Sequence, residues 1–160
     1  MPIKLDNTDW AILRELQEEA RLSYAEIGRR VGLSSPAVQE RIRRLEDASI
    51  IKAYRAEVNY EALGLPIMSI TRILNVQGKD DINQIREIAQ ALPEVIACYH
   101  VMGEDEYIVQ IVAQSVPDLE RVLHDFTDLA KLTSAIVIDM PVEHSTIDLE
   151  QFPNLKALDL

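Results

Sequence analysis

The sequence predicts an α+β protein in which a three-helix part is followed by a part of mixed strands and helices. The first 48 residues contain three helix-sized segments, and a glycine-containing turn separates the second from the third, which is the pattern of a helix-turn-helix unit. Beyond the Gly and Pro of residues 61–66, segments follow in the order β-α-β-β-α-β of a ferredoxin-like sandwich. We therefore expect a helix-turn-helix (winged-helix-like) domain over residues 1–63 and a ferredoxin-like domain over residues 64–160.

The first helix is expected to begin after Asp6 and to end near Ala20. Asp6, with Asp9 three residues later, resembles a capping arrangement, and acidic residues at a helix start are favoured by the helix dipole. The segment then places Ile12, Leu13 and Leu16 on one face, as an amphipathic helix requires.

The next two helices have recognisable starts. Ser23 is expected to cap the second helix, and Gly32 stands where a helix most easily ends in the left-handed conformation. Ser34 can cap a third helix, which carries Pro36 in its first turn, where proline is tolerated, and runs to about Ala48.

The third helix has one apolar face and one face suited to DNA. At 100° per residue Val38, Ile42 and Leu45 cluster and are expected to point into the core. The opposite arc carries Pro36, Gln39, Glu40, Arg43 and Arg44, with Arg41 on its flank. In the major groove arginine recognises guanine and glutamine recognises adenine, whereas flanking arginines, here Arg41 and Arg44, are expected to contact phosphates. Glu40 either accepts from a cytosine amino group or pairs with Arg44.

The charge distribution is uneven. Residues 20–56 contain eight Lys and Arg against four Asp and Glu, a net charge of +4, while the rest of the chain carries −15. A cationic surface attracts duplex DNA, and an acidic remainder discourages indiscriminate binding. Taken alone, the same charges are equally consistent with an ordinary solvated helix face.

The remaining segments are expected as follows. Residues 50–60 alternate as a strand does, and Gly64 marks the hinge between the two domains. The sandwich is then predicted to contain strands at 66–76, 95–103, 106–115 and 135–147 and helices at 80–92 and 116–132. The second and third of these strands flank a Gly-Glu-Asp turn and should form a hairpin.

Several other functions are disfavoured by the composition. No apolar run approaches the ~20 residues of a membrane span, the N-terminus lacks a secretory signal, and the single cysteine fits a reducing compartment, so we expect a cytoplasmic protein that does not bind a membrane. His100, His124 and His144 are far apart and lack a cysteine cluster, so neither a metal nor another cofactor is expected. A dyad of His100 with His144 is less plausible than packed or surface histidines, and Cys98 is expected to be a small buried hydrophobe.

With these residues assigned, residues 5–46 resemble the N-terminal domain of the Lrp/AsnC (feast/famine) transcription regulators, and the βαββαβ part resembles their ligand-sensing half. The resemblance implies a sequence-specific, nucleoid-associated regulator that is not an enzyme and that binds double-stranded DNA. It also implies a homodimer, with assembly into an octamer of four dimers, and a small effector, usually an amino acid, between dimers near the turn Val101 to Tyr107.

The resemblance carries specific residues over to this chain. The implied DNA contacts are Ser34, Ser35, Pro36, Gln39, Arg41, Arg43 and Arg44. The implied effector-binding residues are Val101, Met102, Gly103, Glu104 and Glu106. The chain departs from the family at Ser49, where glycine is usual and where a strained or differently turned helix end is expected. It departs again at Glu106, where aspartate is usual, and at 132–135, which lacks the usual Gly-Val.

Two alternatives remain open from the sequence. Siroheme decarboxylases resemble the same two-domain architecture, but a tetrapyrrole enzyme should bring Arg and His together around the sandwich, and this half is acidic. A protein that senses amino acids or organises the nucleoid without sequence specificity would differ only in selectivity. The turn at Glu104 to Glu106 is either a ligand site or simply a hydrated acidic turn.

Overall fold

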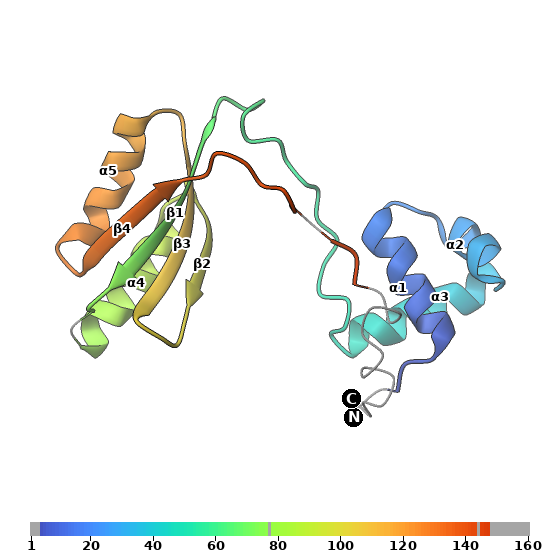
Figure 1. Ribbon diagram of the computed structural model, residues 1–160. Helices are drawn as coiled ribbons and strands as arrows, with labels where there is room; N and C mark the ends of the chain where they lie inside the picture. The colour runs from blue at the N-terminus through green and yellow to red at the C-terminus, as the bar shows by residue number, and fades with distance from the viewer. Residues whose placement is uncertain (1–3, 77, 144, 148–160) are drawn as a thin grey trace. The chain divides into compact units, whose positions relative to one another are not determined.

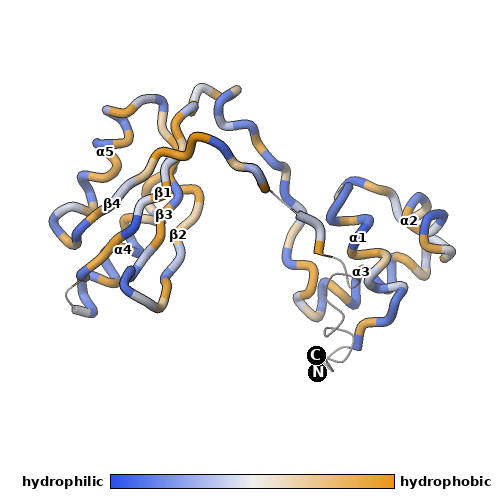
Figure 2. The backbone as a smooth tube through the Cα atoms, in the orientation of Figure 1, coloured by the Kyte–Doolittle hydropathy of each residue, from blue (hydrophilic) through white to orange (hydrophobic). Residues whose placement is uncertain are grey.

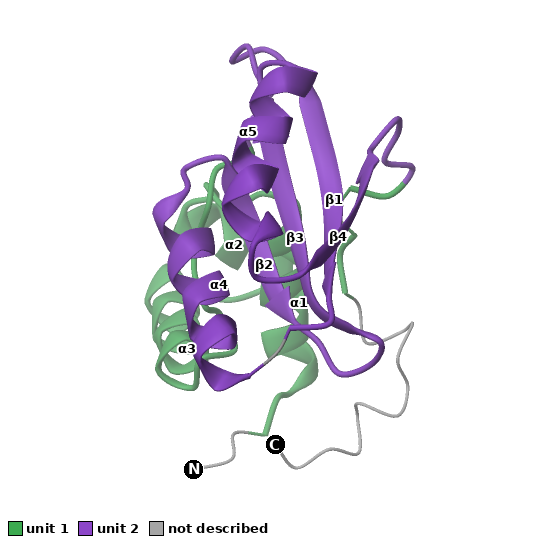
Figure 3. Ribbon diagram, turned by 90° about the vertical axis from the view of Figure 1, so that its left-hand side faces the viewer, with its two compact units in different colours: residues 1–57, 142–160 green, residues 58–141 purple. Residues whose placement is uncertain are grey.

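The computed structural model describes residues 4–76, 78–143 and 145–147, which form two compact units (Figures 1 and 3). One unit contains the chain up to Glu57 together with the segment that begins at Val142, and the other contains Val58–Pro141. The domain boundary expected from the sequence, between residues 63 and 64, stays a prediction. No helix in the described ranges is long and apolar enough to cross a membrane.

The first unit contains three helices whose starts follow the capping pattern in the sequence. α1 (Asn7–Glu18) begins with a reciprocal pair, because the Asp6 carboxylate accepts from the Asp9 backbone N–H at 2.8 Å and Asp9 accepts from that of Asp6 at 3.0 Å. Ser23 caps α2 (Tyr24–Val31), and Ser34 caps α3 (Ser35–Asp47). These starts are confirmed, whereas α1 ends at Glu18, two residues before the predicted end.

The three helices enclose a small apolar core and a tight turn. The predicted inward face of α3 is confirmed, since Val38, Ile42 and Leu45 are buried together with Ile12, Leu13 and Ile27. The turn after α2 approaches Gly28 so closely that a Cβ there would lie 2.4 Å from the Leu33 carbonyl oxygen. Gly32 ends α2 at φ 74°, as predicted.

The predicted strand at residues 50–60 was wrong. The chain leaves α3 through Ser49 at φ 58°, a left-handed value that favours glycine, so the helix end is strained, as expected from a serine at this position. Residues 52–59 are exposed and form no strand. Alternation alone does not make a strand, which needs a hydrogen-bonded neighbour; in the described part of the chain no segment pairs with this one.

The second unit is the predicted ferredoxin-like sandwich. Its elements run in the order β1 (Ile67–Leu74), α4 (Lys79–Ala91), β2 (Val95–His100), β3 (Asp105–Ala113), α5 (Val116–Thr127) and β4 (Lys131–Ile136). The strands form one antiparallel sheet in the order β2-β3-β1-β4, and both helices cover the same face (Figure 1). The hairpin of β2 and β3 is confirmed.

The core of this unit lies between the sheet and the two helices. In register, Ile73 is opposite Tyr107 and Thr71 opposite Val109, and all four are buried beneath the helices. The predicted stripes supply the other side of the core, through Ile85 and Ala89 on α4 and Leu119, Val122 and Phe126 on α5. Hydrophobic residues recur along both helices and strands (Figure 2).

The last strand begins earlier than predicted. α5 ends at Thr127, and β4 begins at Lys131 rather than at residue 135. Its register is set by β1, where Ile73 is opposite Leu132 and Ser69 opposite Ile136. Beyond that pair one backbone bond remains, from Val137 to Met68. The hydrophobic residues that follow β4 therefore have the sequence pattern of a strand, but they extend beyond the first residue of β1, the strand with which β4 pairs.

Candidate nucleic-acid interface and effector site

The start and outer face of α3 present the polar side chains proposed for DNA. Ser34, Pro36, Gln39, Glu40 and Arg43 are exposed, and Ser35 is half-buried. The Arg43 side chain is 72% exposed, and it forms a 3.7 Å ion pair with the equally exposed Asp47 one turn later. Such a contact holds the side chain weakly, so this guanidinium can turn toward a ligand at small cost.

The other two arginines of this helix are held against α1. Arg41 donates to Asp9 at 2.7 Å and to Asp6 at 2.8 Å, and Arg44 donates to Asp9 at 2.5 Å. The Asp9 side chain is completely buried, while Arg41 and Arg44 remain 27% and 46% exposed. Burial of Asp6 opposes a fall of its pKa, but hydrogen bonds from Arg41 and the Asp9 backbone outweigh it and lower the pKa.

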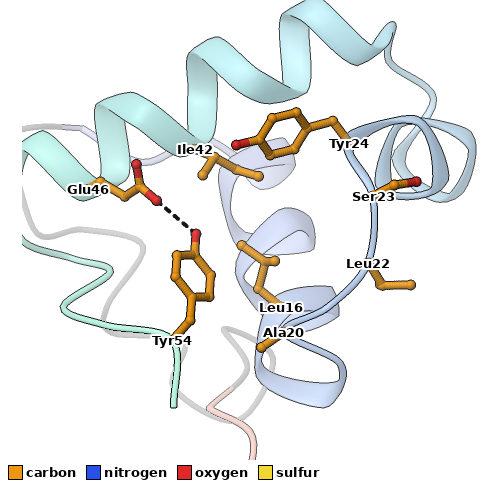
Figure 4. Close-up of a pocket in the computed structure, with 8 residues that line it drawn as sticks. All are labelled: Leu16, Ala20, Leu22, Ser23, Tyr24, Ile42, Glu46 and Tyr54. Carbon is orange, nitrogen blue, oxygen red and sulfur yellow. Dashed lines mark hydrogen bonds between the residues drawn. The ribbon is translucent and has the colours of Figure 1, made fainter. Parts of the chain in front are cut away.

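A pocket in the first unit lies between α3, the chain that joins α1 to α2, and the segment after α3. It has a volume of about 420 Å³ and is lined by Leu16, Ala20, Leu22, Ser23, Tyr24, Ile42, Glu46 and Tyr54 (Figure 4). The Tyr54 hydroxyl donates to Glu46 at 3.0 Å. Partial burial, together with this carboxylate, raises the pKa of Tyr54 to about 12. The Tyr54–Glu46 bond ties the segment after α3 to the last turn of that helix.

The turn proposed for the effector joins β2 to β3. Its closing hydrogen bond runs from the Val101 N–H to the Glu106 carbonyl at 3.0 Å. Met102 is fully exposed, and Gly103 and Glu104 are exposed beside it. Arg72 from β1 holds Asp105 at 2.9 Å, so one of the three acidic residues of the turn is already neutralised. Glu104 and Glu106 remain the carboxylates on which a cationic group could bind.

A second pocket, which the sequence analysis did not predict, lies between α4 and β2. It has a volume of about 400 Å³, and its polar side chains are Arg86, Gln90, Cys98 and His100. His100 stacks on Tyr107 with ring centroids 4.8 Å apart and contacts Glu106 at 3.4 Å, which joins this pocket to the turn. The sequence contains one signal that could have indicated this pocket. Arg86 directly follows the buried Ile85, so it lies at the edge of the helix face that covers the sheet.

Cys98 and the histidines differ in part from expectation. Cys98 is exposed, so the prediction of a buried hydrophobe was wrong. It belongs to β2, an edge strand whose last three residues are exposed. His124 lies on the surface beside Thr127, and His144 lies outside the described residues, as does the tail 152–160. Within the described ranges no group of three His, Cys, Asp or Glu side chains could hold a metal ion.

Comparisons with known proteins match both units. Residues 5–46 match the model of the AsnC-type helix-turn-helix domain, and residues 70–147 match that of the Lrp/AsnC ligand-binding domain. The chain is 34% identical to the HTH-type transcriptional regulator LrpC of Bacillus subtilis over 135 residues, which cover 84% of this chain and 92% of that protein. It is 33% identical to the leucine-responsive regulatory protein of Rhizobium meliloti over 119 residues, with 74% and 76% covered.

Solved structures share the fold. The complex of the regulator NMB0573 from Neisseria meningitidis with L-Met superimposes with a TM-score of 0.84 at 27% identity and covers 92% of this chain and 99% of that one. The structure of B. subtilis LrpC gives a TM-score of 0.83 at 33% identity and covers 89% and 100%.

Proposed function

Because this chain belongs to the Lrp/AsnC family of transcriptional regulators, we propose that it recognises its operator through the outer face of α3, with Arg43 as the main base-contacting side chain. The observation that carries this assignment is the difference among three arginines of one helix. Arg41 and Arg44 are held by the carboxylates of α1, whereas Arg43 is exposed and weakly paired. A weakly held guanidinium can turn to form the bidentate contact with guanine that discriminates between bases.

The other proposed contacts follow from their positions on α3. Gln39 lies one turn before Arg43 on the exposed face and suits adenine. Arg41 and Arg44, fixed in place by Asp9, still have exposed N–H groups that suit phosphates. Ser34, Ser35 and Pro36 lie at the start of the helix, where backbone N–H groups also favour a phosphate.

We further propose that the uncovered face of the sheet pairs with a second copy. Register places Met68, Ile70, Ile108 and Tyr99 on the face opposite the helices, and these residues are half-buried or exposed in the single chain. A two-fold dimer would set two recognition helices about 34 Å apart, so that they meet successive major grooves of a pseudo-palindrome. Four such dimers form the proposed octamer.

The proposed effector is an amino acid bound at the turn formed by Val101, Met102, Gly103, Glu104 and Glu106. The exposed Glu104 and half-buried Glu106 suit its ammonium group. The relative from N. meningitidis forms a complex with L-Met, which supports the same class of ligand for this chain. Binding would act by favouring the assembly whose pocket fits the effector better. We place this regulator in the cytoplasm, associated with the nucleoid.

Fluorescence anisotropy tests the proposed function. The DNA upstream of the protein's own gene and a scrambled duplex of the same length would each be titrated at two salt concentrations. A preference for the upstream DNA that persists at high salt is expected of base recognition, because phosphate contacts weaken steeply with salt. Binding that is equal on both duplexes and is lost at high salt would contradict recognition of that site.

The alternative enzymatic function has its own measurement. A siroheme-decarboxylase-like protein should bind a tetrapyrrole, and a tetrapyrrole absorbs visible light. We expect the purified protein to be colourless and to show no new visible band on addition of siroheme. A stable absorbing complex would favour the enzyme.

A further inference from the structure

We propose that the pocket between α4 and β2 binds the carboxylate of the amino-acid effector through Arg86, which His100 holds in place, while the neighbouring turn binds its ammonium group. The inference rests on the proposed effector function and adds to it the residues that recognise the acidic end of the ligand. An acidic turn alone recognises an amine and repels a carboxylate, so a zwitterion needs a cation close by. Arg86 supplies that cation.

Arg86 differs from the other arginines of its unit. Of the three arginines in Val58–Pro141, Arg72 pairs with Asp105 and Arg121 pairs with Glu94. Arg86 instead contacts the ring of His100, with 3.3 Å between Nη2 and Nδ1. Within the described chain no carboxylate lies within ion-pair distance of Arg86 in the structure. Although the protein is rich in carboxylates, Arg86 contacts a neutral nitrogen instead of a carboxylate. Its positive charge is therefore available to bind an anion.

The geometry of His100 determines which atoms can meet the ligand. A guanidinium can only donate, so Nδ1 of His100 accepts from Arg86 and the ring proton lies on Nε2, which faces Glu106 at 3.4 Å. A ligand carboxylate is a stronger acceptor for Arg86 than a neutral ring nitrogen. His100 therefore lies between the two charged groups that the ligand requires, Arg86 on one side and Glu106 on the other.

The pocket also has room for a side chain. Its volume of about 400 Å³ lies within the range of small-molecule sites. Its apolar lining comes from Ala89, Val95, Ile96 and Ala97. These small and aliphatic groups suit an uncharged aliphatic amino acid better than a charged one, which would add an uncompensated charge.

The same contacts join the pocket to the rest of the unit. Tyr107 stacks on His100, is 1% exposed, and donates its hydroxyl to the Ile82 carbonyl of α4 at 3.3 Å. A ligand that draws Arg86 away from His100 changes the hydrogen bonding of a ring that also contacts the turn. The turn and α4 are therefore coupled through His100.

Isothermal titration calorimetry on the full chain tests the inference. The probes are L-leucine, L-methionine, 4-methylpentanoate, which is leucine without its ammonium group, and 3-methylbutylamine, which is leucine without its carboxylate. The variants are Arg86→Gln, Arg86→Lys and, as a control, Lys79→Gln, which removes an exposed charge from the same helix outside the pocket lining. Circular dichroism checks that each variant is folded.

We expect Arg86→Gln to weaken binding of the amino acid and of 4-methylpentanoate by about 10- to 100-fold and to leave 3-methylbutylamine unchanged. Arg86→Lys should recover part of the loss, and Lys79→Gln should bind as the wild type does. Equal amino-acid binding by wild type and Arg86→Gln would overturn the inference and leave the proposed effector function standing. If the wild type binds neither amino acid, the aliphatic effector fails, and with it the inference, while operator binding is unaffected.

Discussion

Asp9 determines how the recognition helix is held. Its carboxylate is completely buried, and both of its oxygens accept hydrogen bonds from α3, one from Arg41 and the other from Arg44. The sequence assigned Asp9 to the helix start and both arginines to phosphate. The structure shows that Asp9 completes the capping box of Asp6 at the start of α1 and also orients two cations of α3. Pairings across 32 and 35 residues cannot be deduced from a local pattern.

We expect Asp9→Ala to lower the free energy of unfolding by about 2–4 kcal/mol, because it removes one partner of a buried ion cluster and leaves two arginines without it. Chemical denaturation monitored by circular dichroism measures the change. Asp47→Ala is the matched control, since Asp47 is exposed and lies 3.7 Å from Arg43. A similarly small change for both variants would show that the cluster contributes little.

Asp6 makes the stability of the first unit depend on pH. Its pKa is lowered in the folded state, so its contribution is present above its ordinary value of 3.8 and is lost as the pH falls through the lowered value. Asp6→Asn keeps a good cap but removes the charge. We expect the wild type to have the higher melting temperature at pH 6 and this advantage to decline progressively as the pH falls below 3.8. An advantage independent of pH would exclude the Arg41 pair as its cause.

At the scale of the helix and the strand, the sequence predicts well what is decided within about four residues. The caps at Asp6, Ser23 and Ser34 and the end of α2 at Gly32 are all confirmed, because donor and acceptor are close in sequence. The predicted strand at 50–60 and the start of β4 were wrong, because a strand is set by its neighbour. Arg86 and His100 were likewise missed as a pair, since α4 and β2 meet only in the folded unit.

The end of α3 offers a direct test of local strain. Ser49 has φ 58°, where a side chain is disfavoured and glycine is not. We expect Ser49→Gly to raise the free energy of unfolding by about 0.5–1 kcal/mol. Gly32→Ser makes the opposite change at φ 74° and should lower it by a similar amount. Thermal unfolding distinguishes the two, and a loss of stability in Ser49→Gly would exclude strain at this position.

At the scale of the whole molecule, the uncovered sheet face provides the proposed two-fold contact. Ile70→Glu places a charge at its centre, where burial without a partner is costly. We expect this variant to sediment as a monomer and to lose affinity for a two-half-site operator. Leu63→Glu changes an exposed residue outside the sheet and should leave the assembly unchanged. If both variants keep the wild-type mass, the dimer uses another surface.

The uneven distribution of charge explains how an acidic chain can bind DNA. The excess positive charge is confined to residues 20–56, so each copy of a dimer would present one cationic face and an acidic remainder. In the proposed complex, phosphate contacts would supply affinity, and a few side chains of α3 would supply selectivity.

The central claim is that Arg43 contacts bases while Arg44 contacts phosphate, and one comparison of affinities tests it most directly. Arg43→Ala and Arg44→Ala would each be titrated by fluorescence anisotropy against the upstream DNA and the scrambled duplex. We expect Arg43→Ala to lose about 10-fold or more on the upstream DNA and little on the scrambled duplex, and Arg44→Ala to weaken both about equally. Equal losses for both variants on both duplexes would contradict the assignment.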